Sequence, residues 1–230
     1  MRILVVGEGP TDCGRYKDNQ WVDGPVQIYL RRLLPSADVI TIDKNHIRRD
    51  RKSNSRQQRS IRGLKGHSIK AYYAAEIAKE QSCDCVAVYV DADKPEDNPK
   101  AEHSCRQRYQ NIKQQIIDGL SAAHVEKQIA IVPLKMIESW MLGDPNAFPP
   151  IYQCQPNNRW FKKPELLWGD KSDPQSDYPK CVLNRVLKEC HTTACQDEFV
   201  KIAKAQNLDT VKERCPISFS DFAAQVKTLL

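Results

Sequence analysis

Residues 85–97 read CVAVYVDADKPED, a short apolar run that leads directly into two aspartates. Cys85–Val90 shows no alternation of polar and apolar residues, which is typical of a parallel strand with both faces covered. Asp91 and Asp93 follow at the carboxyl end of this predicted strand. Functional residues of open parallel sheets gather at that end of the strands, so the pair predicts a site.

A second stretch of the same kind lies at residues 2–12, which read RILVVGEGPTD. Arg2–Val6 is predicted to be a buried strand, and Glu8 follows it between two glycines that allow a sharp turn. If the two strands are parallel neighbours, Glu8 meets Asp91 and Asp93 at one edge of the sheet. Carboxylates so close repel one another unless a cation lies between them, and the expected cation is Mg²⁺.

Two more predicted strands and a series of helices complete the pattern. The other strands are Val39–Ile42 and Ile129–Val132. Helical periodicity predicts Val22–Leu34, Ser68–Glu80, Cys105–Ala123, Met136–Leu142, Tyr178–Cys190, Cys195–Ala205 and Phe219–Leu230. The alternation of strands and helices favours an α/β fold with a four-stranded parallel sheet, flanking helices and a helical C-terminal extension. We predict a core over residues 1–143 and, over residues 144–230, a loop-rich and helical extension packed on the same core.

Positive charge is concentrated in one segment of the chain. The net charge is +6, but residues 44–70 contain ten lysines and arginines against one aspartate, so the rest of the chain is mildly acidic. Cations in such a strip neutralise nucleic-acid phosphates and release counterions. The predicted nucleic-acid-binding residues are Arg48, Arg49, Arg51, Lys52, Arg56, Arg59, Arg62 and Lys65. A solvated loop and an acidic protein partner are the alternatives.

Composition points to the cytoplasm and away from membranes. No run approaches the ~18 apolar residues that a membrane span needs, and the apolar run directly after Met1 is not that of a signal peptide. The nine cysteines are odd in number and scattered, which speaks against a complete disulfide framework. Zinc binding by Cys181, Cys190, His191 and Cys195 is disfavoured by their irregular spacing. The sequence contains no Walker A loop, and Gly7-x-Gly9 lacks the third glycine of a dinucleotide site.

The placement of these acids resembles the Toprim fold of topoisomerases, primases and nucleases of the OLD (overcoming lysogenization defect) type. In that fold a glutamate follows the first strand and an Asp-x-Asp pair follows the third. The chain also resembles a family of small Toprim-like proteins, and the resemblance spans nearly its whole length. The matching motifs are EGPTD (Glu8–Asp12), ESWMLGD (Glu138–Asp144), YPK (Tyr178–Lys180) and CPISFSDF (Cys215–Phe222). Asp12, Ser139 and the strongly basic residues 44–65 depart from the family pattern.

The resemblance implies cleavage of nucleic-acid phosphodiesters with Mg²⁺ (or Mn²⁺), often beside a partner ATPase in anti-phage defence. Asp91 and Asp93 would hold metal, and Glu8 would hold metal or accept a proton from the attacking water. Lys180, in preference to Lys171, would neutralise charge on the phosphate. Glu138 either supports the site or caps the helix of Trp140.

Two other functions stay open at this point. One is a catalytically silent Toprim-like subunit that binds nucleic acid or regulates a partner ATPase. The other is a small-molecule phosphotransfer enzyme or phosphatase, which the basic strip argues against. The sequence leaves open whether the protein is a homo-oligomer. Trp140 is expected in the core and not as a base-stacking surface.

Overall fold

The computed structural model describes residues 1–7, 9–42, 63–93 and 98–230. It groups the chain into two compact units, each built from separated segments. The first comprises Met1–Val90, Gln110–Ile131 and Gln225–Leu230, and the second comprises Asp91–Tyr109 and Val132–Ala224. Residue 143, the predicted boundary, falls inside the second unit, and the predicted division stays a prediction.

The first unit is built on a parallel four-stranded sheet with the strand order β4-β1-β5-β6. The strands are β1 (Arg2–Val6), β4 (Asp38–Thr41), β5 (Cys85–Tyr89) and β6 (Gln128–Ile131). β1 and β5 are direct neighbours, with Val6 opposite Val88. Ile3 to Val6 are completely buried, as expected for a strand covered on both faces. The predicted α/β fold with a parallel sheet is confirmed, and every strand boundary lies within one residue of its prediction.

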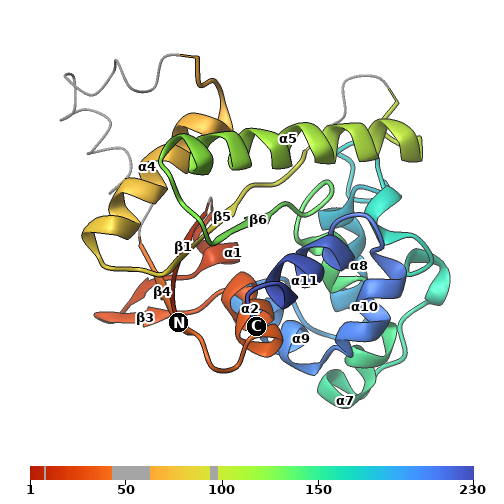
Figure 1. The fold of residues 1–230 in the computed structure, drawn as a ribbon. Helices are drawn as coiled ribbons and strands as arrows, with labels where there is room; N and C mark the ends of the chain where they lie inside the picture. Colours follow the sequence, from red (N-terminus) through yellow and green to blue (C-terminus); the bar gives the residue numbers. More distant parts are fainter. Residues whose placement is uncertain (8, 43–62, 94–97) are drawn as a thin grey trace. The chain divides into compact units, whose positions relative to one another are not determined.

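Helices flank this sheet and make the crossovers between its strands (Figure 1). They are α2 (Pro25–Leu33), α4 (His67–Glu80) and α5 (Glu102–Ala122). Pro25 occupies the first turn of α2, where its missing N–H costs no hydrogen bond. The N–H of Gly24 donates to the side chain of Gln27 at 3.0 Å, which caps the helix start. α2 ends two residues before Pro35, as the sequence predicts.

A short hairpin precedes α2, where the sequence predicts no strands. After the short helix α1 (Pro10–Cys13), β2 (Arg15–Lys17) pairs with β3 (Gln20–Val22) in antiparallel fashion. Its two-residue loop consists of Asp18 and Asn19, with φ of 50° and 62°. Two-residue hairpin loops require positive φ, which aspartate and asparagine tolerate better than most residues. Val22, predicted as the first residue of a helix, therefore ends a strand instead.

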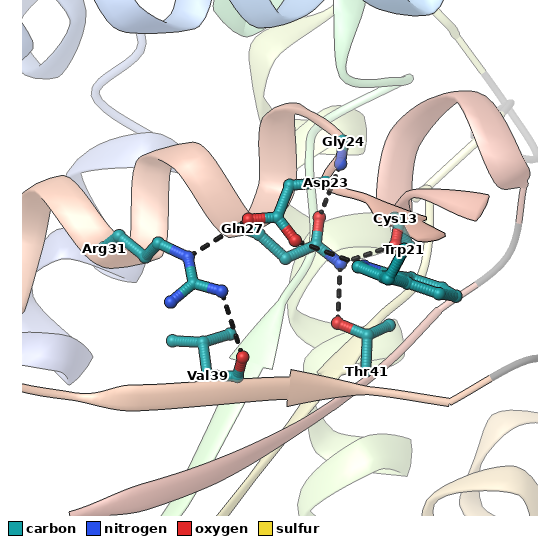
Figure 2. A network of polar contacts seen from close by, with 8 residues as sticks. All are labelled: Cys13, Trp21, Asp23, Gly24, Gln27, Arg31, Val39 and Thr41. Atoms are coloured by element: carbon teal, nitrogen blue, oxygen red, sulfur yellow. Dashed lines mark hydrogen bonds and ion pairs between the residues drawn. The ribbon is translucent and has the colours of Figure 1, made fainter. Parts of the chain in front are cut away.

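Gln27 ties this region to the edge of the sheet (Figure 2). Its buried amide nitrogen donates to the carbonyl of Cys13 and, at 2.9 Å, to the hydroxyl of Thr41 at the end of β4. Arg31 adds a second link, because its guanidinium donates to Asp23 at 3.1 Å and to the carbonyl of Val39 at 3.0 Å. These bonds fix the segment that follows β1 at the carboxyl end of the sheet.

The second unit is helical. Its helices are α6 (Glu138–Met141), α7 (Phe148–Tyr152), α8 (Pro179–Glu189), α9 (Gln196–Ala205) and α10 (Leu208–Arg214), together with most of α11 (Phe219–Lys227) and the short 3₁₀ helices η2 (Pro145–Ala147), η3 (Asn158–Trp160) and η4 (Pro164–Leu166). Trp140 is completely buried in it, stacked on Phe222 at 5.4 Å and edge-on to Phe219 at 5.0 Å. This confirms Trp140 as a core residue. The helical C-terminal region is confirmed as well.

Cys154 and Cys190 form a disulfide within the second unit. Cys190 belongs to the cysteine and histidine group weighed as a zinc site, and the bond removes it from that group. The remaining seven cysteines are free thiols, five of them buried. No helix of the described ranges is long and apolar enough to cross a bilayer.

Candidate active site

The carboxyl ends of β1 and β5 come together in the first unit. A Cβ added to Gly7 would lie 3.1 Å from the side chain of Tyr89 and 2.0 Å from the sulfur of Cys13, so only glycine fits there. Gly7, which precedes Glu8, therefore lies against Tyr89, which is two positions before Asp91. Glu8 itself lies outside the described residues, and its meeting with the aspartates stays a prediction.

Asp91 and Asp93 stand on a backbone that continues to pair beyond β5. In the second unit the N–H of Ala92 donates to the carbonyl of Pro133 at 3.0 Å, and that of Asp93 to the carbonyl of Lys135 at 3.1 Å. Arg108 secures the same turn by donating to the carbonyl of Ala92 at 2.8 Å. Asp93 has a φ of 47°, so the extended backbone ends before it. In extended backbone, residues two apart point to the same side. The sequence Asp-x-Asp suggests this alignment for Asp91 and Asp93, but the backbone at Asp93 does not have it.

The two aspartates nevertheless act on one common group, the hydroxyl of Tyr178. Burial raises the pKa of Tyr178, and the negative charges of Asp93, Glu138 and Asp91 raise it further, to about 12. All four side chains belong to the second unit, and their mutual influence places them within electrostatic reach of one another. Tyr178 is half-buried and directly precedes α8, where Trp168 packs edge-on against its ring at 5.4 Å.

Lys180 is the positive charge beside this cluster. α6 packs against α8, which brings Glu138 in the first turn of α6 near Lys180 in the first turn of α8. Glu138 is only 7% exposed; burial raises its pKa, while its own backbone N–H and the Lys180 ammonium lower it. Lys180 is exposed. Of the five predicted catalytic residues, Asp91, Asp93 and Glu138 act electrostatically on Tyr178, and Lys180 acts on Glu138.

Sequence reasoning passed over Tyr178 and Lys135. Lys135 is completely buried, and its ammonium donates to the carbonyl of Pro99 and lies 3.3 Å from the sulfur of Cys105 and 4.9 Å from the centre of the Trp168 ring. Burial lowers its pKa. Lys135 therefore braces Trp168, which in turn packs on Tyr178. The YPK motif contained Tyr178, but only its lysine was singled out.

The residues at hand suit Mg²⁺ in their chemistry. Asp91, Asp93 and Glu138 offer carboxylate oxygens, which hard divalent cations prefer, and Asp93 is exposed to incoming solvent. Burial is the main cause of the raised pKa of Tyr178, and the charges of Asp93, Glu138 and Asp91 add to it. Among residues 1–7, 9–42, 63–93 and 98–230, no three acids, histidines or cysteines are close enough to form a metal cage. Glu8, the third predicted ligand, falls outside those ranges.

The predicted basic strip also falls mostly outside the described ranges. Arg48, Arg49, Arg51, Lys52, Arg56, Arg59 and Arg62 lie there, and their nucleic-acid contacts stay a prediction. Lys65 is exposed in the turn before α4, held by a 2.8 Å bond from its N–H to the hydroxyl of Ser68. Farther along α4, the ammonium of Lys70 donates to the carbonyl of Tyr89 at 3.4 Å, at the end of β5.

Comparison with known proteins identifies the family and nothing finer. Neither the curated proteins nor the solved structures include a significant match to the chain. A protein-family model described as a domain of unknown function (DUF4276) matches residues 26–227, which includes Asp91, Asp93, Glu138, Tyr178 and Lys180. Because the match covers most of the sequence, the chain belongs to the DUF4276 family.

Proposed function

We propose that this protein is a Toprim-like nuclease that uses Mg²⁺ (or Mn²⁺) to cleave nucleic-acid phosphodiesters. The observation that carries the proposal is that Asp93, Glu138 and Asp91 act on Tyr178 within the second unit, while Lys180 acts on Glu138 across the packed helices α6 and α8. In phosphoryl transfer, carboxylates hold the metal ion, and a cation and a hydroxyl donor stabilise the charge on the phosphate. The parallel sheet, with Gly7 against Tyr89 at its carboxyl edge, supports the same assignment.

Asp91 and Asp93 would hold the metal ion, with Glu8 as the predicted third ligand. A bound divalent ion lowers the pKa of a coordinated water and neutralises charge on the phosphate. Glu138 is less exposed than either aspartate and lies near Lys180. Its role is to orient the lysine, because a nearby carboxylate restrains an ammonium that otherwise moves freely on its flexible stem.

Lys180 and Tyr178 would act on the phosphate itself. Lys180 is exposed, so its ammonium can neutralise a phosphate oxygen in the transition state. Tyr178, with a pKa of about 12, keeps its proton at neutral pH and can donate a hydrogen bond to the same group. The two side chains are separated by Pro179 alone, so the start of α8 presents both.

The test is a cleavage assay on single-stranded and duplex DNA and RNA with Mg²⁺ or Mn²⁺. Asp91→Asn and Asp93→Asn keep the size of the side chain and remove its charge. Each should lower the cleavage rate by about 10³-fold or more, because a bound metal supplies several kcal/mol of transition-state stabilisation. The matched control is Asp209→Asn, since the Asp209 side chain is 87% exposed on α10.

Cleavage that survives both substitutions would reject the proposed site. A wild-type protein that binds nucleic acid, yet leaves every substrate intact with either metal, would favour the alternative of a catalytically silent subunit. The partner ATPase and the role in anti-phage defence rest on the family resemblance alone. They would be supported by co-purification of an ATPase with the full chain.

A further inference from the structure

A cavity of about 680 Å³ opens along α8, within the second unit. Four of its ten lining residues are basic, and none of the described residues that line it is acidic. The basic side chains are those of Lys171, Lys180, Arg185 and Lys188. Lys171, Lys180 and Lys188 are exposed, so their charges face solvent and remain available to an anion.

The wall of the cavity is held in place by Arg185. Its guanidinium donates to the carbonyls of Pro174 and Ser176, at 2.6 and 2.7 Å, and lies over the ring of Trp160 at 5.2 Å. It also pairs with Asp177 at 3.7 Å. Charge-assisted bonds to two carbonyls fix the segment before α8, so the cavity is formed before any ligand arrives.

The cavity is continuous with the candidate active site. Tyr178 and Lys180 both line it. The charges of Asp93, Glu138 and Asp91 act on Tyr178, and Lys180 acts on Glu138 across the packed helices α6 and α8. A phosphate held between Lys180 and the carboxylates therefore has an open basic space beside it. Asn184, with its amide, and Tyr178, with its aromatic ring, are among the residues that line this space.

We propose that this cavity binds the phosphates of a single-stranded segment next to the bond that is cut. Its volume of about 680 Å³ lies within the ~300–1,000 Å³ of small-ligand sites. Cations combined with an aromatic ring are what single strands bind. The inference rests on the proposed nuclease function and adds the substrate class, a single strand and not a paired duplex.

The test is strand binding in EDTA, where no metal-dependent cleavage occurs. The affinity of a labelled oligothymidylate is measured by fluorescence anisotropy for the wild type and for the double variant Lys171→Ala, Lys188→Ala. These lysines lie outside the catalytic group. Each phosphate contact to a single strand contributes about 0.7 to the slope of log affinity against log salt. The double variant should therefore lower that slope by about 1.4 and raise Kd roughly 25-fold at 0.1 M salt.

The matched control is Lys204→Ala, Lys227→Ala, which removes two exposed charges that do not line the cavity. Its Kd should stay within about twofold of the wild type, as expected for screened surface charges. Circular dichroism of both double variants verifies that they are folded. Equal Kd values for the cavity variant and the wild type would overturn the inference, and so would equal losses in the two variants.

Two further experiments distinguish a single strand from a duplex and from a small polyanion as the ligand. Together with the cleavage assay, they also distinguish failure of this inference from failure of the nuclease proposal. A fully paired duplex should lose no more affinity in the cavity variant than in the control variant. Inorganic tripolyphosphate should displace the strand only at far higher concentration than unlabelled strand, and equal competition would replace the strand with a small polyanion. Cavity-dependent strand binding without cleavage would sustain this inference while the nuclease proposal fails. Cleavage by a protein whose strand binding does not depend on the cavity lysines would support the nuclease proposal and overturn this inference.

Discussion

Burial and the negative charges of Asp93, Glu138 and Asp91 together determine the chemistry of Tyr178 at the scale of a single residue. Burial and these charges hold its pKa at about 12, so the phenol is a proton donor over the whole physiological range and not a base. Lys180 supplies the compensating positive charge. The same side chains that raise the pKa of Tyr178 are the ones that a divalent ion would neutralise.

Tyr178→Phe should lower kcat for strand cleavage about 100-fold and leave KM nearly unchanged, since one donor to the transition state is lost and packing is kept. The ratio of wild-type to variant rates should stay constant from pH 7 to 9, because burial, the largest cause of the raised pKa of Tyr178, persists when a metal ion neutralises the neighbouring carboxylates. Steady-state kinetics across this pH range make the measurement. Tyr16→Phe, on a tyrosine that is 65% exposed, is the control. A variant with wild-type kcat would remove Tyr178 from the reaction.

At the residue scale, the sequence singled out the aspartates of the candidate site but not the lysine and tyrosine that accompany them. Asp91 and Asp93 were predictable because two carboxylates directly after an apolar strand have few structural uses. Lys135 was not, because nothing in its local pattern reveals that an ammonium is buried against Trp168. The role of Tyr178 was not predictable either. Its raised pKa depends partly on Glu138, which lies 40 positions earlier in the chain and is brought near only by folding.

At the scale of elements, Ser218 joins the segments that support α6 and α11. Its hydroxyl accepts from the N–H of Leu134 at 3.1 Å and from the indole of Trp140 at 2.7 Å, and it donates to Glu165. Glu165 also accepts from the N–H groups of Ile217 and Ser218, at 2.9 and 2.8 Å. The motifs ESWMLGD and CPISFSDF therefore meet in the core of the second unit, which explains their joint presence.

Ser218→Ala should lower the free energy of unfolding by about 3 kcal/mol, because two buried donors and a buried carboxyl lose their common partner. For a chain of this length the melting temperature should fall by roughly 6–12 °C. Thermal unfolding followed by tryptophan fluorescence measures the change. Ser220→Ala, at a half-buried serine in α11, which begins one residue after Ser218, should shift the melting temperature by less than about 2 °C. Equal shifts in the two variants would show that the hydroxyl of Ser218 contributes nothing special.

Long elements with a clear period were predictable, and short ones were not. α4, α5, α8 and α9 lie within three residues of their predicted ends, because each carries its own apolar period. The hairpin formed by β2 and β3 was missed, since its strands have three residues each and depend on the positive φ of Asp18 and Asn19. α7 and α10 are likewise too short to show a period.

At the scale of the whole molecule, the chain crosses between its two units several times. Gln225, near the C-terminus, bonds both the N–H and the carbonyl of Ala130 in β6, at 2.9 and 3.2 Å. Contacts between segments so far apart in the sequence cannot be recognised from composition or periodicity. The sequence therefore suggested a single boundary after residue 143. The α/β class and the strand neighbours were predictable because strand–helix alternation restricts the topology.

The account depends most on the binding of a divalent cation by Asp91 and Asp93. Isothermal titration of Mn²⁺ into the full-length wild-type chain and into the double variant Asp91→Asn, Asp93→Asn tests it without any substrate. The account predicts saturable binding by the wild type and affinity at least ~100-fold lower in the double variant, with Asp209→Asn unchanged. Equal Mn²⁺ affinity in the wild type and the double variant would contradict it.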